Sequence, residues 1–157
     1  MRPAESIGAA APPAGELPAG AWRTVVPVRF SHCDPAGIVY FPRYFDMING
    51  VVEDWFAGAL DLPHHHFIRD RRVGLGPAHA EADFMKPGFL ADELVFAVLV
   101  DRIGTSSLAL SVHAHRGDEP VLKARFVIVT TSLAEHRAIQ IPEDLRAALE
   151  RYQERCR

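Results

Sequence analysis

One short loop brings together residue types that could act on a carbonyl group. Asp34 is followed by Pro35, which restricts the aspartate to an extended backbone, and by Gly37, which permits a tight turn. A carboxylate held in such a loop can serve as a nucleophile or as a general base. The alternative is that Asp34 only helps to close the turn, which is the commoner role of an Asp-Pro pair.

The loop leads into the most strongly periodic stretch of the chain, which predicts a long helix starting at Pro42. Apolar side chains recur at helical spacing from Tyr44 to Ala59. Phe41 then occupies the N-cap, and because phenylalanine cannot cap, the first-turn amides are not all satisfied locally. Unsatisfied amides at a positive helix end can receive a carbonyl oxygen or an anion. A reaction that builds negative charge on a carbonyl fits both the amides and Asp34.

Histidines offer weaker candidates. His64, His65 and His66 are consecutive and share no helical face, so a solvated loop from residue 61 to 72 is favoured over a metal site. His113 and His115 share one face of a predicted strand, but no third ligand is evident. We therefore expect an exposed strand face there, and no bound metal.

The second half of the chain alternates with period two and predicts strands joined by short turns. Such connections imply an antiparallel sheet, and the pattern as a whole indicates an α+β domain with about five curved strands around one long helix. We expect this domain to span residues 22–157. Residues 1–21 are rich in Ala, Pro and Gly, which predicts a flexible tail and not a signal peptide.

Composition excludes several classes of protein. The 157 residues are 48% hydrophobic, enough to bury a core, and the net charge of −3 argues against binding to nucleic acid or to a membrane surface. No apolar stretch is long enough to cross a membrane. The two cysteines, Cys33 and Cys156, form no disulfide framework or zinc pattern, which favours a cytoplasmic location. Dinucleotide-binding, Walker, GxSxG and HExxH motifs are missing from the sequence.

The segment from His32 to Tyr44 (HCDPAGIVYFPRY) closely resembles the active-site segment of 4-hydroxybenzoyl-CoA thioesterases. The wider acyl-CoA thioesterase family shares a D-x-x-G-x-V-Y-like core, present here from Asp34 to Tyr40. The stretch from Arg137 to Leu145 also resembles that family's C-terminal end, and the similarity runs from about Val25 to Leu149. It implies a hotdog fold, in which an antiparallel sheet wraps one long helix.

The resemblance also implies roles for individual residues. Asp34 would be the catalytic carboxylate, attacking the thioester carbonyl or activating water, and the Phe41 N–H would polarise that carbonyl. Asn49 stands where the 4-hydroxybenzoyl enzyme has an aspartate associated with the substrate hydroxyl, which is a departure from that specificity. An Arg-Arg-Lys run of the family is also replaced here, so Arg102 and the cluster of Arg69, Arg71 and Arg72 would have to meet the CoA phosphates.

The expected reaction is hydrolysis of an acyl-CoA thioester, with CoA as part of the substrate and no separate cofactor. Tyr40 and Tyr44 make an aromatic acyl group plausible, although such side chains also occur in any buried helix. A non-catalytic acyl-CoA-binding or regulatory hotdog module is the main alternative. A hotdog dehydratase, with His32 as its histidine, fits less well. The resemblance also implies that this chain forms a homodimer or a dimer of dimers (a homotetramer), with the active site across the dimer interface.

Overall fold

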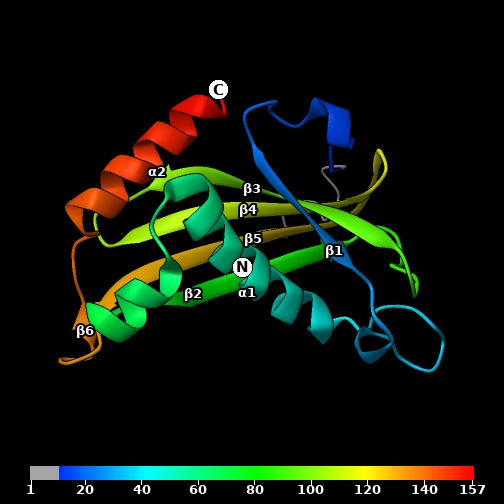
Figure 1. The fold of residues 1–157 in the computed structure, drawn as a ribbon, viewed down its shortest axis with the longest axis horizontal. Coiled ribbons are helices and arrows are strands. Elements are labelled where there is room, and N and C mark those ends of the chain that lie inside the picture. Colours follow the sequence, from blue (N-terminus) through cyan, green and yellow to red (C-terminus); the bar gives the residue numbers. More distant parts are fainter. Residues whose placement is uncertain (1–10) are drawn as a thin grey trace, which may run out of the picture.

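The computed structural model describes residues 11–157, which form one antiparallel sheet with a long helix packed against it. Five strands run in the spatial order β1-β3-β4-β5-β2, and the short β6 pairs with the end of β5. Their bounds are Trp22–Pro27 (β1), Val73–Phe84 (β2), Glu93–Ile103 (β3), Ser107–Arg116 (β4), Glu119–Ser132 (β5) and Arg137–Ala138 (β6). Figure 1 shows the sheet curving around the helix, as predicted for a hotdog fold.

Helix α1 (Pro42–Leu60) is enclosed by the concave face of this sheet and begins at the predicted proline. Its apolar stripe is buried, and the side chains of Trp55 and Phe56 are fully so. They belong to one core with the inward-facing side chains of the strands, which include Leu94, Phe96 and Val98. Each large apolar side chain buried in this way contributes roughly 1.5–3 kcal/mol, so packing fixes the position of the helix.

Two further helical segments lie near the C-terminal end of α1. Helix α2 (Glu143–Arg155) packs against β3 and α1, and its Tyr152 hydroxyl donates to the Val98 carbonyl oxygen at 2.5 Å. The predicted loop from residue 61 to 72 contains instead a π-helical turn, His66–Asp70, which buries Phe67. Between residues 11 and 157, no helix has the length and apolar character needed to cross a membrane.

The expected tail through residue 21 differs from the structure in its second half. Residues 1–10 lie outside the described part of the chain, but residues 11–21 pack against the folded domain. Ala11 and Leu17 are buried, the Gly15 N–H donates to Asp118 Oδ1, and the Pro12 carbonyl oxygen lies 2.8 Å from His115 Nε2. These contacts join segments about a hundred residues apart, which composition alone does not reveal.

The face of β4 that carries His113 and His115 is covered, so the expectation of an exposed strand face is wrong. Only 4% of His113 and 1% of His115 is exposed, and the two rings lie nearly parallel. The N-terminal segment accounts for part of this cover through Pro12. Alternation along a strand identifies two faces but does not show what lies over the second one.

Burial of His113 should make stability depend on pH. Burial, helped by Lys123 and His115, lowers the pKa of His113 from 6.5 to about 4. The unfolded chain, with a histidine pKa near 6.5, therefore binds more protons between pH 6.5 and 4, and the free energy of unfolding should fall over that window by up to ~3 kcal/mol. Urea unfolding at pH 7, 5.5 and 4.5 measures this loss.

A pair of variants isolates the contribution of this histidine. His113→Leu should flatten the pH dependence between 6.5 and 4, whereas His65→Leu, at an exposed histidine, should leave it unchanged. An equally steep pH dependence in His113→Leu would show that other groups cause the loss.

Candidate active site

Asp34 lies in a tight turn that fixes one oxygen of its carboxylate. Oδ1 accepts a hydrogen bond from the Ala36 N–H at 2.8 Å, and the Asp34 carbonyl oxygen accepts one from the Gly37 N–H at 3.0 Å. Gly37 has a φ of 76°, a conformation that glycine adopts without strain. Among residues 11–157, Oδ2 has no hydrogen-bond partner. Asp34 thus closes the turn with one oxygen and leaves the other available.

The start of α1 leaves one amide unused beside this turn. Phe41 has helical backbone angles and provides no side-chain cap. The Arg43 N–H donates to the Tyr40 carbonyl oxygen and the Tyr44 N–H to that of Phe41, at 2.8 and 3.2 Å. The N–H of Phe41 itself donates to no acceptor in the described chain. It is therefore the amide of the first turn that can bind a carbonyl oxygen.

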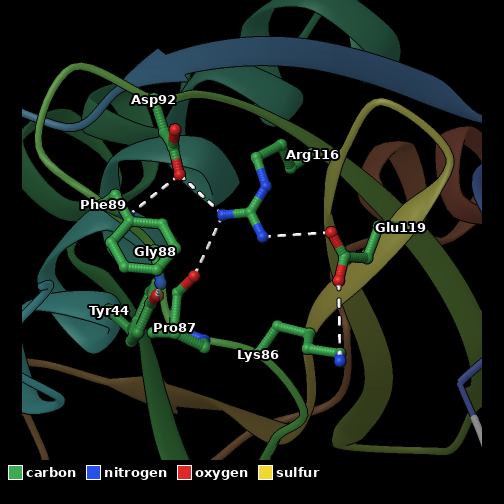
Figure 2. Close-up of polar contacts among 8 residues, drawn as sticks. All are labelled: Tyr44, Lys86, Pro87, Gly88, Phe89, Asp92, Arg116 and Glu119. Atoms are coloured by element: carbon green, nitrogen blue, oxygen red, sulfur yellow. Dashed lines mark hydrogen bonds and ion pairs between the residues drawn. The ribbon is translucent and has the colours of Figure 1, made fainter.

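A second loop, residues 85–92 between β2 and β3, braces the Asp34 turn. The Val39 N–H donates to the Gly88 carbonyl oxygen at 2.8 Å, and the Leu90 N–H donates to the Gly37 carbonyl oxygen at 3.1 Å. The Gly88 N–H donates in turn to the hydroxyl of Tyr44, which is buried (Figure 2). Burial raises the pKa of Tyr44. The predicted substrate-binding residue Tyr44 thus holds the brace in place through its hydroxyl.

An apolar cleft of about 550 Å³ opens beside Phe41. Phe41 and Phe84 line it with their rings edge to face, and Lys86 adds a positive charge. The remaining lining residues are Ile38, Val39, Tyr44, Met85 and Pro87. Sequence reasoning missed Phe84, Met85 and Lys86, since the Lys-Pro-Gly sequence indicated only a turn. Asp34 and the exposed Tyr40 are not part of the lining.

Asn49 lines a different pocket, farther along α1. That pocket, of about 170 Å³, lies between α1 and strands β2 and β5, and its polar lining residues are Asn49, Glu53 and His64. Burial lowers the pKa of His64, while Glu53 acts in the opposite direction. The structure therefore does not bring Asn49 into the cleft beside Phe41.

The four arginines expected to bind CoA lie far from the Asp34 turn within the chain. Arg69, Arg71 and Arg72 follow the C-terminal end of α1, whose 19 residues span about 28 Å, and Asp34 precedes its N-terminal end (Figure 1). Arg69 pairs with Asp70, and Arg71 forms a bidentate pair with Asp144. Arg102 is exposed near the C-terminal end of β3, whereas the brace loop leads into the N-terminal end of that strand.

Two other arginines lie close to the Asp34 turn. Burial lowers the pKa of His32, and the positive charges of Arg29 and Arg43 lower it further. Both arginines are exposed, and neither forms an ion pair with another described residue. Asp46 acts on His32 in the opposite direction, so the two positive charges are partly offset there. In residues 11–157, no three His, Cys, Asp or Glu side chains gather in a group that could hold a metal ion.

Comparison with known proteins shows which family the chain belongs to. The family profile of the thioesterase-like superfamily matches residues 28–149, which include the turn, the helix and all strands after β1. The chain belongs to the thioesterase-like superfamily. The prediction of a thioesterase is thereby confirmed at the level of the family, while the narrower 4-hydroxybenzoyl-CoA resemblance stays a prediction.

Individual relatives cover most of the chain. A 1,4-dihydroxy-2-naphthoyl-CoA hydrolase of Nostoc punctiforme is 25% identical over 124 residues, covering 78% of this chain and 82% of the relative. A thioesterase-superfamily structure from Jannaschia sp. CCS1 superposes with a TM-score of 0.80 at 25% identity, covering 86% of this chain and 94% of that one. A Synechocystis 1,4-dihydroxy-2-naphthoyl-CoA thioesterase superposes with a TM-score of 0.75 at 20% identity, covering 82% and 95%. The hotdog fold is thus confirmed.

The close approach of the two loops predicts that Gly88 cannot carry a side chain. A Cβ at this position would lie 2.6 Å from the Tyr44 hydroxyl and 3.1 Å from a Val39 methyl group. Gly88→Ala should therefore push the brace away from the turn and lower the free energy of unfolding by about 1–3 kcal/mol. Urea unfolding measures the loss. Gly76→Ala is the control, because no heavy atom lies within 4 Å of its Cβ, and equal losses in both variants would contradict the packing argument.

Proposed function

We propose that the protein hydrolyses an acyl-CoA thioester, with Asp34 as the catalytic carboxylate. The observation that carries this proposal is the pairing of a half-free carboxylate with the unused Phe41 N–H at the start of α1. The amide would stabilise the negative charge that develops on the thioester oxygen, at the positive end of the helix dipole. Asp34 would attack the carbonyl carbon or remove a proton from attacking water, and both mechanisms remain open.

The acyl group is best accommodated by the apolar cleft. Its rings, Phe41 and Phe84, are respectively 57% and 47% exposed, and burying them against an acyl group would be favourable. The relative from Nostoc punctiforme is named for an aromatic acyl group, which supports an aroyl substrate here. The 4-hydroxybenzoyl group is one member of that class, but Asn49 cannot accept a proton from its hydroxyl. We propose an aroyl-CoA as the substrate class.

A second copy of the chain would complete the site. β2 is one of the two edge strands of the described sheet, the other being β1, and from Gly76 its side chains are mostly exposed. A long exposed edge strand is a surface for pairing with another strand. We propose a homodimer formed through the sheets at β2, which could pair further into a tetramer. In that assembly Asn49 and Tyr40 of one copy could approach the substrate held by the other.

Removing the carboxylate tests the mechanism. Asp34→Ala should lower kcat for acyl-CoA hydrolysis by about 10²- to 10⁴-fold, because the nucleophile or base is lost. Thiol release from a panel of aroyl-, short-chain and long-chain-CoA thioesters measures the rate and identifies the acyl class. Asp46→Ala removes a nearby exposed carboxylate on α1 and should keep most of the activity. Full activity in Asp34→Ala would refute the mechanism.

A binding module without catalysis makes a different prediction. It would bind acyl-CoA tightly with no thiol release, and Asp34→Ala would bind as well as the natural sequence. Measuring ligand binding beside thiol release separates the two functions.

Substitutions in two sets of arginines can identify the side chains that bind the CoA phosphates. By resemblance, Arg102 and the cluster of Arg69, Arg71 and Arg72 are proposed to bind them, which would require a second copy to bring them near Asp34. Arg29 and Arg43 are already beside the turn and lack ion-pair partners among the described residues. We therefore expect the double variant Arg29→Ala/Arg43→Ala to raise KM for acyl-CoA about tenfold through lost charge-assisted contacts.

The control substrate carries the same acyl group on pantetheine, which lacks the phosphates. For this substrate, the double variant and the natural protein should have the same KM. If only substitutions at 69, 71, 72 and 102 raise KM for acyl-CoA, the phosphates bind to those arginines from another copy.

A further inference from the structure

The guanidinium of Arg116, at the end of β4, is the centre of a polar cluster on the brace loop (Figure 2). Nη1 donates to the Pro87 carbonyl oxygen at 3.0 Å and to Asp92 Oδ2 at 2.8 Å, and Nη2 donates to Glu119 Oε2 at 3.0 Å. The side chains of Arg116 and Asp92 are only 29% and 19% exposed. This partial burial makes their ion pair stronger than a solvated surface pair.

Asp92 connects the arginine to a second point of the brace. Its Oδ2 also accepts the Phe89 N–H at 2.9 Å, and the Arg116 guanidinium lies over the Phe89 ring. Burial opposes ionisation of Asp92, but the bonds from the Phe89 amide and Arg116 outweigh it and hold the pKa of Asp92 below its ordinary value. The pair thus stays charged at neutral pH, and it fixes the loop at Pro87 and at Phe89.

These two points flank the residues that hold the catalytic turn. Gly88 lies between the two points, and its carbonyl oxygen accepts the Val39 N–H. Leu90 follows Phe89, and its N–H donates to the Gly37 carbonyl oxygen. The turn then closes on itself, because the Asp34 N–H donates to the Ile38 carbonyl oxygen at 3.0 Å. An unbroken path of hydrogen bonds and backbone therefore runs from Arg116 through the brace to Asp34.

We propose that Arg116, acting through Asp92 and Pro87, is a positioning residue that sets Asp34 against the Phe41 amide. The inference rests on the proposed function, since it concerns the geometry of that reaction. The Arg116 guanidinium is already bound to three acceptors of the chain, two of them on the brace loop, so we assign its action to the brace. Its planar fork serves three acceptors at fixed angles, which a lysine ammonium cannot reproduce.

Kinetics distinguish positioning from a general loss of stability. Arg116→Met should lower kcat by about 10- to 100-fold, because a small displacement of catalytic groups is costly, and KM should change less than about threefold. Arg116→Lys and Asp92→Asn should give intermediate losses, since each keeps part of the cluster. A purely structural role would reduce the amount of folded enzyme and leave kcat per folded molecule unchanged.

A control variant removes a comparable group without touching the brace. Arg125→Met removes an exposed arginine that pairs with Glu81 on the sheet, and its kcat should stay within about twofold of that of the natural protein.

Amide hydrogen exchange tests the positioning without using activity. Arg116→Met should accelerate exchange of the Val39 and Leu90 amides at least tenfold, while the Val112 amide in β4 should stay protected. Unchanged exchange, or accelerated exchange with unchanged kcat, would overturn the inference. If Arg116→Met does not fold, kcat and amide hydrogen exchange are measured on Arg116→Lys and Asp92→Asn instead.

Failure of the proposed function gives a different result. Natural protein that hydrolyses none of the thioesters, or Asp34→Ala with full activity, refutes the function. In that case, hydrogen exchange of the Val39 and Leu90 amides in Arg116→Met still shows whether Arg116 holds the Asp34 turn in place.

Discussion

Helix α1 has almost no freedom to move, because the sheet encloses it and its stripe from Tyr44 to Leu60 is buried. Moving its axis would expose Trp55 and Phe56 or create cavities among them, at a cost of several kcal/mol. The position of its first turn is therefore set by a core that lies mostly farther along the helix. Every feature of the candidate site is arranged around that fixed end.

The local chemistry of the helix start explains why it can serve as a site. Pro42 has no N–H to satisfy, and Phe41 has no side-chain oxygen to offer as a cap. A helix start with a serine or aspartate cap would be more stable by roughly 0.5–2 kcal/mol, but its amides would be occupied. The brace loop supplies the missing rigidity by binding Gly37 and Val39 instead of the Phe41 amide. The site is thus held firmly while its donor remains open.

Local patterns in the sequence predicted the parts of this arrangement that depend on neighbouring residues. The start of α1 at Pro42, the turn at Gly37 and the sheet around the helix all follow from spacing and backbone preference. Resemblance added a role for Asp34 that an Asp-Pro pair alone does not indicate. The structure adds that its second oxygen is unpartnered in the described chain.

Contacts between distant residues could not be predicted in this way. Arg71 pairs with Asp144, 73 positions away, and Arg116 meets Asp92 through the register of β3 and β4. Asn49 lines a separate pocket, because it lies on the side of α1 that faces β2 and β5. Its distance from Asp34 along the sequence does not predict this. Part of the cover over His115 comes from a segment whose composition resembles a tail. Each case requires the three-dimensional arrangement of elements, not their identity.

The distribution of charge follows from the same arrangement. A net charge of −3 would repel an anionic thioester, yet the acidic groups near the brace are bound to Arg116, and Arg71 neutralises Asp144 at the other end of the helix. Arg29 and Arg43 lack such partners among residues 11–157 and stand beside a helix start that is itself positive. Cationic side chains are therefore present beside the Asp34 turn although the overall charge is negative. Such side chains favour the approach of a phosphate-bearing substrate, and the positive helix start favours the oxyanion that forms when a carbonyl is attacked.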